Sequence, residues 1–143
     1  MNYTHFWRLN EKGCEKCYKL GLLSITNLID SSFMIVGNSR GDPNSSPYTK
    51  DSIIFNGIAP FDNELFYLPK SLKSSSGIYS CNTRGHLYDD LVMASLVILQ
   101  DYLGNDIKIY SERDKKAWSS GICMAGGLNL RLCSWEELSE DKF

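Results

Sequence analysis

The stretch LYDDLVMASLVILQDYL, from Leu87 to Leu103, is the longest strongly apolar segment of the chain and decides its fold. Apolar residues recur in it at helical spacing and leave only a narrow polar stripe. A helix that is apolar almost all round has to be covered on most sides, here by a sheet and by another helix. Its run Leu91–Leu99, apolar except for Ser95, is nine residues long, whereas a membrane span needs about twenty. We therefore predict a buried helix in a protein that does not enter a membrane.

Patterns on both sides of this helix predict the remaining elements. An apolar stripe with lysines outside it predicts a helix over residues 11–30. Ser134, followed three residues later by Glu137, is a capping box that predicts a final helix over 135–141. One or two helical turns are expected within 114–120. Short apolar or alternating runs predict strands at 5–9, 33–36, 52–55, 65–68, 78–81, 107–111 and 128–132.

This order of elements predicts an α+β fold in a single domain, residues 1–143. We expect a mainly antiparallel sheet of about five to seven strands, with one long buried helix and a second helix packed on one face. The order resembles that of small bacterial and phage proteins, and this resemblance implies no particular activity.

The charge of the chain argues against one class of partner. Its 143 residues carry a formal net charge of −2, and 22% of them are charged. Residues 51–143 hold thirteen acidic side chains against nine Lys and Arg. A general nucleic-acid binder normally carries a basic patch, so we do not expect direct nucleic-acid binding.

The cysteines indicate the compartment. Five is an odd number, and the first residues lack the apolar segment of a signal peptide. Reduced thiols in the cytoplasm are the expected state. Cys14-x-x-Cys17 resembles half of a zinc site, but no second pair follows. A redox pair would need a preceding buried strand, so we interpret both as buried helix cysteines and predict neither a metal nor a cofactor.

The polar loop before the central helix is the best candidate for a binding site. A helix N-terminus presents unpaired N–H groups and suits an anion, and Thr83, Arg84 and His86 would add a hydroxyl, a bidentate cation and an imidazole. Tyr88 or Trp118 would stack on the ligand, and Arg40 would close over it from the loop at residues 37–48. Structural alternatives remain open: Thr83 as a helix cap, and Arg84 paired with the acids of the first helical turn. The predicted ligand-binding residues are Thr83, Arg84, His86, Tyr88, Arg40 and Trp118.

Catalytic signatures are scarce. The chain contains no G-x-S-x-G or H-E-x-x-H motif, and residues 37–41, GNSRG, lack the Lys-Ser/Thr of a phosphate-binding loop. A hydrolase assembled from His5, His86, Asp89, Glu112 and Asp114 stays an alternative, with His86 and Asp89 as its core.

These observations favour a small, cytoplasmic, non-enzymatic binding protein of bacterial or phage type. We expect it to capture an anionic small molecule, such as a nucleotide signal, or a host protein. The alternatives are a protein-partner inhibitor of anti-defence or nucleic-acid-mimic type that uses the acidic C-terminal half, and a nucleotide or phosphoester hydrolase. A homo-oligomer is compatible with each of these predictions.

Overall fold

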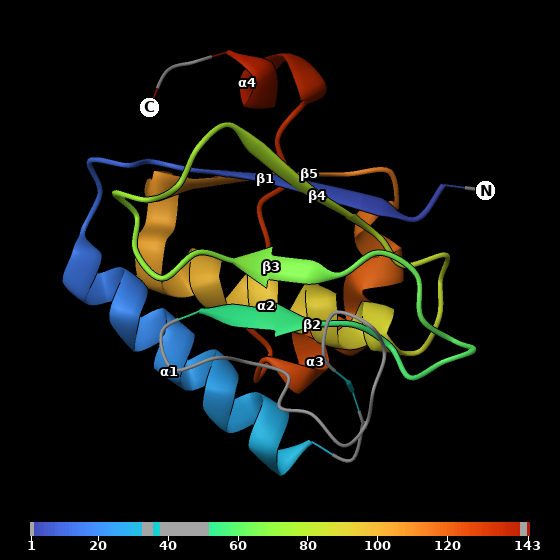
Figure 1. Cartoon of the computed structure of the whole chain (residues 1–143). Helices are drawn as coiled ribbons and strands as arrows, with labels where there is room; N and C mark the ends of the chain where they lie inside the picture. Colours follow the sequence, from blue (N-terminus) through green and yellow to red (C-terminus); the bar gives the residue numbers. More distant parts are fainter. Residues whose placement is uncertain (1, 33–35, 38–51, 141–142) are drawn as a thin grey trace.

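The computed structural model describes residues 2–32, 36–37, 52–140 and 143 of the chain, and Figure 1 shows how its elements are arranged. Strand β1 (Thr4–Leu9) is the middle strand of a three-stranded antiparallel sheet, between β4 (Ile78–Asn82) and β5 (Ile107–Ser111). Strands β2 (Ile53–Phe55) and β3 (Phe66–Leu68) form a separate antiparallel hairpin. The α+β class is therefore confirmed.

The prediction of one sheet with five to seven strands is wrong, because the strands divide into sheets of three and two. Strands β2 and β3 are only three residues long and, within the described residues, pair as strands only with each other. The connection between them is long, as expected. Of the predicted strand at 33–36, residues 33–35 lie outside the described part of the chain.

Helix α2 (Tyr88–Leu103) lies beneath the three-stranded sheet and is buried over most of its length, as the sequence predicts. It ends at Gly104, whose φ of 57° is a left-handed conformation that glycine adopts without steric conflict. Helix α1 (Glu15–Ser31) packs on α2. The two helices approach closely at Gly21, where a Cβ atom would lie 2.9 Å from the side chain of Leu99.

Helix α1 begins four residues later than predicted. Asn10 forms a turn first, because its side-chain oxygen accepts the N–H of Lys12 and its carbonyl accepts the N–H of Gly13. Cys14 then caps the helix, with its sulfur accepting the N–H of Cys17. Cys14 is exposed rather than part of the buried stripe, so the interpretation as buried helix cysteines is wrong for Cys14, whereas Cys17 lies in α1 and is half-buried. The expectation of reduced thiols is also wrong for this pair, because the two residues form a disulfide.

The three-stranded sheet is covered on both faces. Side chains alternate along β1, so that Trp7 points into the core while Phe6 points to the other side. Helix α4 (Trp135–Ser139) packs there through Trp135, whose ring centroid lies 5.2 Å from that of Phe6, and Figure 1 shows α2 and α4 on opposite sides of the sheet. Helices therefore do not lie on one face only. The capping box that opens α4 is confirmed, because Ser134 Oγ accepts the N–H of Glu137.

The predicted strand at 128–132 is wrong, although its residues alternate cleanly. The side chain of Gln100 on α2 bonds both backbone groups of Arg131, each at 2.8 Å, and thereby replaces a strand ladder. The segment before it contains more helix than expected: a 3-10 helix, η2 (Lys115–Trp118), runs into α3 (Ser119–Met124). Across the described residues, no helix combines the length and the apolarity that crossing a membrane requires.

Candidate functional site

A buried group of polar side chains joins the end of the sheet to the start of α2. His5 Nε2 lies 2.6 Å from Asp89 Oδ1, and its Nδ1 lies 2.8 Å from Ser111 Oγ. The second oxygen of Asp89 accepts a hydrogen bond of 2.6 Å from Arg113. We call this group the His5 cluster; its members are His5, Thr83, Asp89, Ser111, Arg113 and Trp118.

The strand register creates this cluster. His5 lies opposite Ser111 in the β1–β5 ladder, so their side chains share the inner face of the sheet. Asp89 comes from the first turn of α2, directly below that face. Trp118 is fully buried at the end of η2 and packs edge-on against the His5 ring, with 5.0 Å between the ring centroids.

The hydrogen bonds fix which atom donates to which. Ser111 Oγ accepts from the backbone N–H of Arg113 at 3.0 Å and from Trp118 Nε1 at 3.3 Å. A hydroxyl oxygen has two lone pairs, so its own proton is directed at His5 Nδ1. Nε2 of His5 is the donor in its contact with Asp89, because a carboxylate can only accept.

Asp89 is held as a carboxylate in the interior. Burial by itself raises the pKa of Asp89, but the hydrogen bond and the electrostatic attraction of His5, together with the hydrogen bonds from Thr83 and Arg113, outweigh it and lower that pKa below its usual value. The adjacent Asp90 behaves in the opposite way, because partial burial and the charge of Asp89 raise its pKa. Only Asp89 is therefore tied into the cluster.

The order Ser111–His5–Asp89 matches the connectivity of a serine–histidine–aspartate relay. The resemblance ends at the nucleophile, because both lone pairs of Ser111 Oγ already accept hydrogen bonds. His5 and Asp89 are also buried, which shields them from a substrate. The cluster thus links β1, β5 and α2, and the Ser111 hydroxyl in it is not activated as a nucleophile.

The predicted binding loop, residues 83–86, lies directly on this cluster. Thr83 is fully buried, and its hydroxyl bonds Asp89 and accepts the N–H of Gly85. The N–H of Arg84 is taken by the side chain of Asn82, and that of His86 by the carbonyl of Thr83. Three backbone donors of the loop are therefore already bonded to groups of residues 82 and 83.

The side chain of Arg84, in contrast to that of Thr83, points outward. Arg84 is exposed and has a φ of 54°, a left-handed conformation that is uncommon for a residue other than glycine. The half-buried ring of His86 meets the ring of Phe61 edge-on, at 5.9 Å between centroids. Phe61 belongs to the connection between β2 and β3, which runs beside this loop in Figure 1.

The remaining predicted residues are not gathered at this surface. Tyr88 is buried, and its hydroxyl donates to the carbonyl of Glu64 at 2.7 Å. The Trp118 ring is fully buried as part of the His5 cluster, so neither aromatic side chain is presented for stacking here. Arg40 lies outside the described residues. Sequence reasoning missed Ser111 and Arg113, for which no motif exists; only the alternation of β5 gives a signal, since it directs Ser111 to the same face as Ile109.

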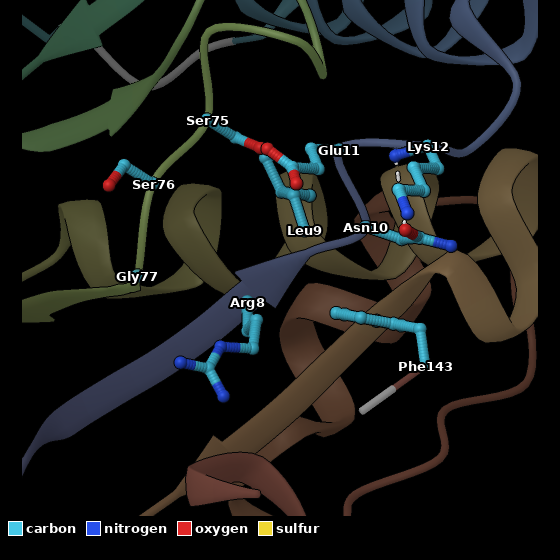
Figure 2. Close-up of a pocket in the computed structure, with 9 residues that line it drawn as sticks. All are labelled: Arg8, Leu9, Asn10, Glu11, Lys12, Ser75, Ser76, Gly77 and Phe143. Atoms are coloured by element: carbon cyan, nitrogen blue, oxygen red, sulfur yellow. Dashed lines mark hydrogen bonds between the residues drawn. The ribbon is translucent and has the colours of Figure 1, made fainter. Parts of the chain in front are cut away.

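A polar groove opens on another part of the molecule, beside the turn that links β1 to α1. Its volume is about 610 Å³, and Figure 2 shows that its lining comes from β1, this turn, the segment before β4 and the last residue of the chain. The guanidinium of Arg8, at the edge of the groove, already donates hydrogen bonds to the carbonyls of Leu138 and Glu140. The lining residues that carry functional groups are Arg8, Asn10, Glu11, Lys12, Ser75 and Ser76.

The described residues include no group of three or more His, Cys, Asp or Glu that could hold a metal ion. Comparison of the chain with family models, with curated proteins and with solved structures finds no match.

Proposed function

We propose that the protein is a non-enzymatic binding protein that captures an anionic small molecule through Arg84 and His86. The observation that carries this proposal is the exposure of the Arg84 side chain together with its backbone conformation. Its guanidinium is exposed and forms no ion pair with any described residue, while its backbone is held in a left-handed conformation.

An arginine is a poor choice for this position if the turn is only structural. The left-handed conformation brings Cβ against the following carbonyl and costs about 1–2 kcal/mol for most residues. Glycine or asparagine would close the same turn at less cost. Strained residues of this kind cluster at sites of function, and the side chain gained here is a planar cation that can bind a phosphate through two hydrogen bonds.

The groups beside Arg84 suit a nucleotide. The imidazole of His86 adds a hydrogen-bonding group, and the Phe61 ring next to it is 63% exposed. An exposed aromatic ring can stack on a base of any identity. Phe61 therefore takes the stacking role that the sequence analysis gave to Tyr88 and Trp118.

Calorimetric titration with mono-, di- and cyclic nucleotides, and with pyrophosphate as the base-free probe, tests the proposal. Arg84→Gly keeps the turn and removes the cation, so we expect it to weaken binding about a hundredfold, the value of a bidentate charged contact. Arg84→Lys should retain part of the affinity. The control Lys116→Ala removes an exposed cation from η2 and should bind like wild type. Equal affinities for Arg84→Gly and wild type would refute the proposal.

A protein-partner inhibitor is the second candidate, and helix α4 favours it. Glu136, Glu137 and Glu140 are exposed there beside Trp135, which is 42% exposed. Carboxylates around an aromatic residue form a surface suited to a basic partner. Replacing the three glutamates by glutamine should then abolish capture of the partner and its dependence on salt, while Arg84→Gly should leave capture unchanged.

The geometry does not favour a hydrolase that uses His86 and Asp89. Both carboxylate oxygens of Asp89 are engaged by His5 and Arg113. The His86 ring contacts Phe61 instead.

A further inference from the structure

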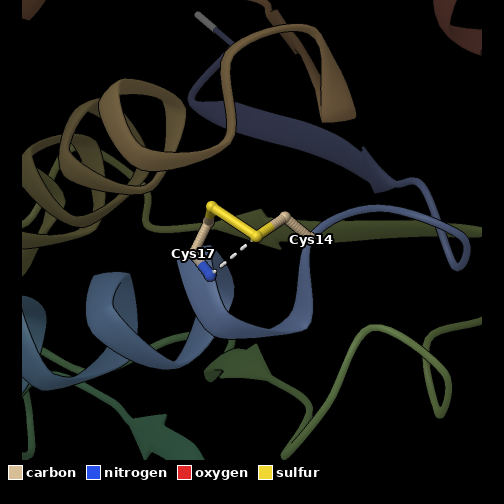
Figure 3. Close-up of a disulfide and its surroundings, with 2 residues drawn as sticks. All are labelled: Cys14 and Cys17. Atoms are coloured by element: carbon tan, nitrogen blue, oxygen red, sulfur yellow. Dashed lines mark hydrogen bonds between the residues drawn. A yellow bond between two sulfur atoms is a disulfide. The ribbon is translucent and has the colours of Figure 1, made fainter.

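The first turn of α1 carries a disulfide between Cys14 and Cys17, shown in Figure 3. The two Cα atoms are 5.2 Å apart, within the range that a disulfide bridges without moving the backbone. Cys14 is the N-cap residue, and its sulfur accepts the N–H of Cys17 at 3.1 Å. A sulfur thus occupies the place where a serine or aspartate oxygen usually caps a helix.

The two sulfur atoms differ in accessibility. Cys14 is exposed, whereas Cys17 is half-buried and packs against the hydrophobic core. Thiol–disulfide exchange requires an in-line approach of one sulfur to another. An incoming thiol or disulfide can therefore reach Cys14, while Cys17 stays close enough to displace it afterwards.

The surroundings stabilise a thiolate at Cys14. Helix α1 is 17 residues long, so its N-terminus carries the full partial positive charge of a helix dipole. The nearest acid in the helix, Glu15, is turned away and accepts the backbone N–H groups of Leu72 and Lys73. A cysteine thiolate at a helix N-terminus is the usual reactive species of Cys-x-x-Cys pairs.

A purely structural role explains this disulfide poorly. It closes a loop of only a few residues, and the constraint that a disulfide places on the unfolded chain grows with loop length. Cys81, Cys123 and Cys133 remain free thiols, so the bond is not one of a set of stabilising bridges. A strand with alternate residues buried, β1, also directly precedes the turn into α1.

We propose that Cys14 and Cys17 form a redox-active pair that exchanges electrons with disulfides and thiols of other molecules. In the reduced protein, the Cys14 thiolate attacks a disulfide R–S–S–R′; that S–S bond breaks, R′S⁻ leaves and takes up a proton, and Cys14 is joined to R. The Cys17 thiolate then attacks Cys14 Sγ and releases RS⁻, which is also protonated. Two electrons pass to the substrate, and the Cys14–Cys17 disulfide forms.

Equilibration in glutathione buffers tests the pair. The protein carries Cys123→Ser, which removes the exposed one of the three free thiols. Alkylation followed by peptide mass spectrometry measures the fraction of protein in which the Cys14–Cys17 pair is oxidised. We expect the pair to pass from mostly oxidised to mostly reduced within the range of ratios that glutathione buffers cover. A pair that stays oxidised in the most reducing of these buffers, while the protein remains folded, would show a structural disulfide and overturn the proposal.

Single variants in the same background assign the roles of the two sulfurs. With oxidised glutathione as the probe, Cys17→Ser should accumulate a mixed disulfide on Cys14, because no second thiol resolves it. Cys14→Ser should form its adduct on Cys17 at least about tenfold more slowly, as expected for a shielded thiol away from the cap. Equal rates, with circular dichroism showing both variants folded, would contradict the assignment. The nucleotide titrations concern residues of a different loop, so failure of either proposal leaves the other testable.

Discussion

His5 Nε2 lies 2.6 Å from Oδ1 of Asp89 and thereby connects the middle strand of the sheet to the first turn of the central helix. The two residues are 84 positions apart in the chain, and both are buried. The loop that carries Arg84 is fastened to the same carboxylate through Thr83. The stability of the fold and the shape of the proposed binding surface therefore depend on one aspartate.

We predict that Asp89→Asn lowers the free energy of unfolding by roughly 2–3 kcal/mol. The substitution removes the charge that faces Arg113 and places an amide group against donors of the cluster, which leaves a buried polar group unsatisfied. Urea denaturation at neutral pH measures the loss. Asp90→Asn is the matched control at the next position and should change the free energy by less than about 0.5 kcal/mol. Equal losses of unfolding free energy in both variants would show that Asp89 contributes no more to stability than its neighbour Asp90.

The pH dependence of stability should reveal the same residue. The pKa of Asp89 is lower in the folded protein than in the unfolded chain, so its contribution is complete above the unfolded value of about 3.9 and disappears as the pH falls through the folded value. The difference in stability between wild type and Asp89→Asn should shrink as the pH falls below about 4. A difference that persists unchanged to the lowest pH at which both proteins fold would contradict this.

Arg84→Gly should raise stability although it destroys the proposed site. Relieving the strain of the left-handed backbone raises the free energy of unfolding by about 1–2 kcal/mol. The greater conformational freedom of glycine in the unfolded chain lowers it by about 0.4–1 kcal/mol. A net gain of about 0.5–1 kcal/mol is expected from thermal denaturation. Lys116→Gly, at an exposed position of η2, is the control and should not stabilise the protein. A loss of stability in Arg84→Gly would make Arg84 a structural residue.

Gly85 and Gly77 form a matched pair for the packing of the loop. Both have left-handed φ values, 73° and 65°, but a Cβ at Gly85 would lie 2.8 Å from the Tyr3 ring, whereas a Cβ at Gly77 meets nothing within 4 Å. Alanine at either position causes backbone strain, and only at Gly85 does it also displace Tyr3 from its contact with Arg113. We expect Gly85→Ala to cost about 1 kcal/mol more than Gly77→Ala in thermal denaturation. Equal losses would mean that the Tyr3 contact is unimportant.

The parts of the fold that sequence predicts well are those with a strong local pattern. The apolar repeat of α2, its glycine end and the capping box of α4 depend on residues close together in the chain. The alternation at 128–132 is equally regular, yet it forms no strand because Gln100, about thirty positions earlier, takes both backbone groups of Arg131. Competition of that kind has no local signal.

The candidate site shows the same limit. Sequence placed Thr83, Arg84 and His86 in one loop, but the depth of Thr83 and the outward direction of Arg84 depend on the His5 cluster. That cluster depends in turn on the β1–β5 register, which sets His5 opposite Ser111. The cysteine pair differs from the prediction for another reason. Cys14 is in phase with the buried stripe of α1, but the helix begins one residue after it, so Cys14 caps the helix and is exposed.

Native mass spectrometry of the freshly purified protein, compared with its denatured spectrum, tests the proposed function most directly. Wild type and Arg84→Gly are expressed and purified in parallel. We predict that wild type carries an added mass that is lost on denaturation and corresponds to an anionic small molecule, and that Arg84→Gly is bare. The same added mass on both proteins, or none on either together with no nucleotide binding by calorimetry, would contradict the account.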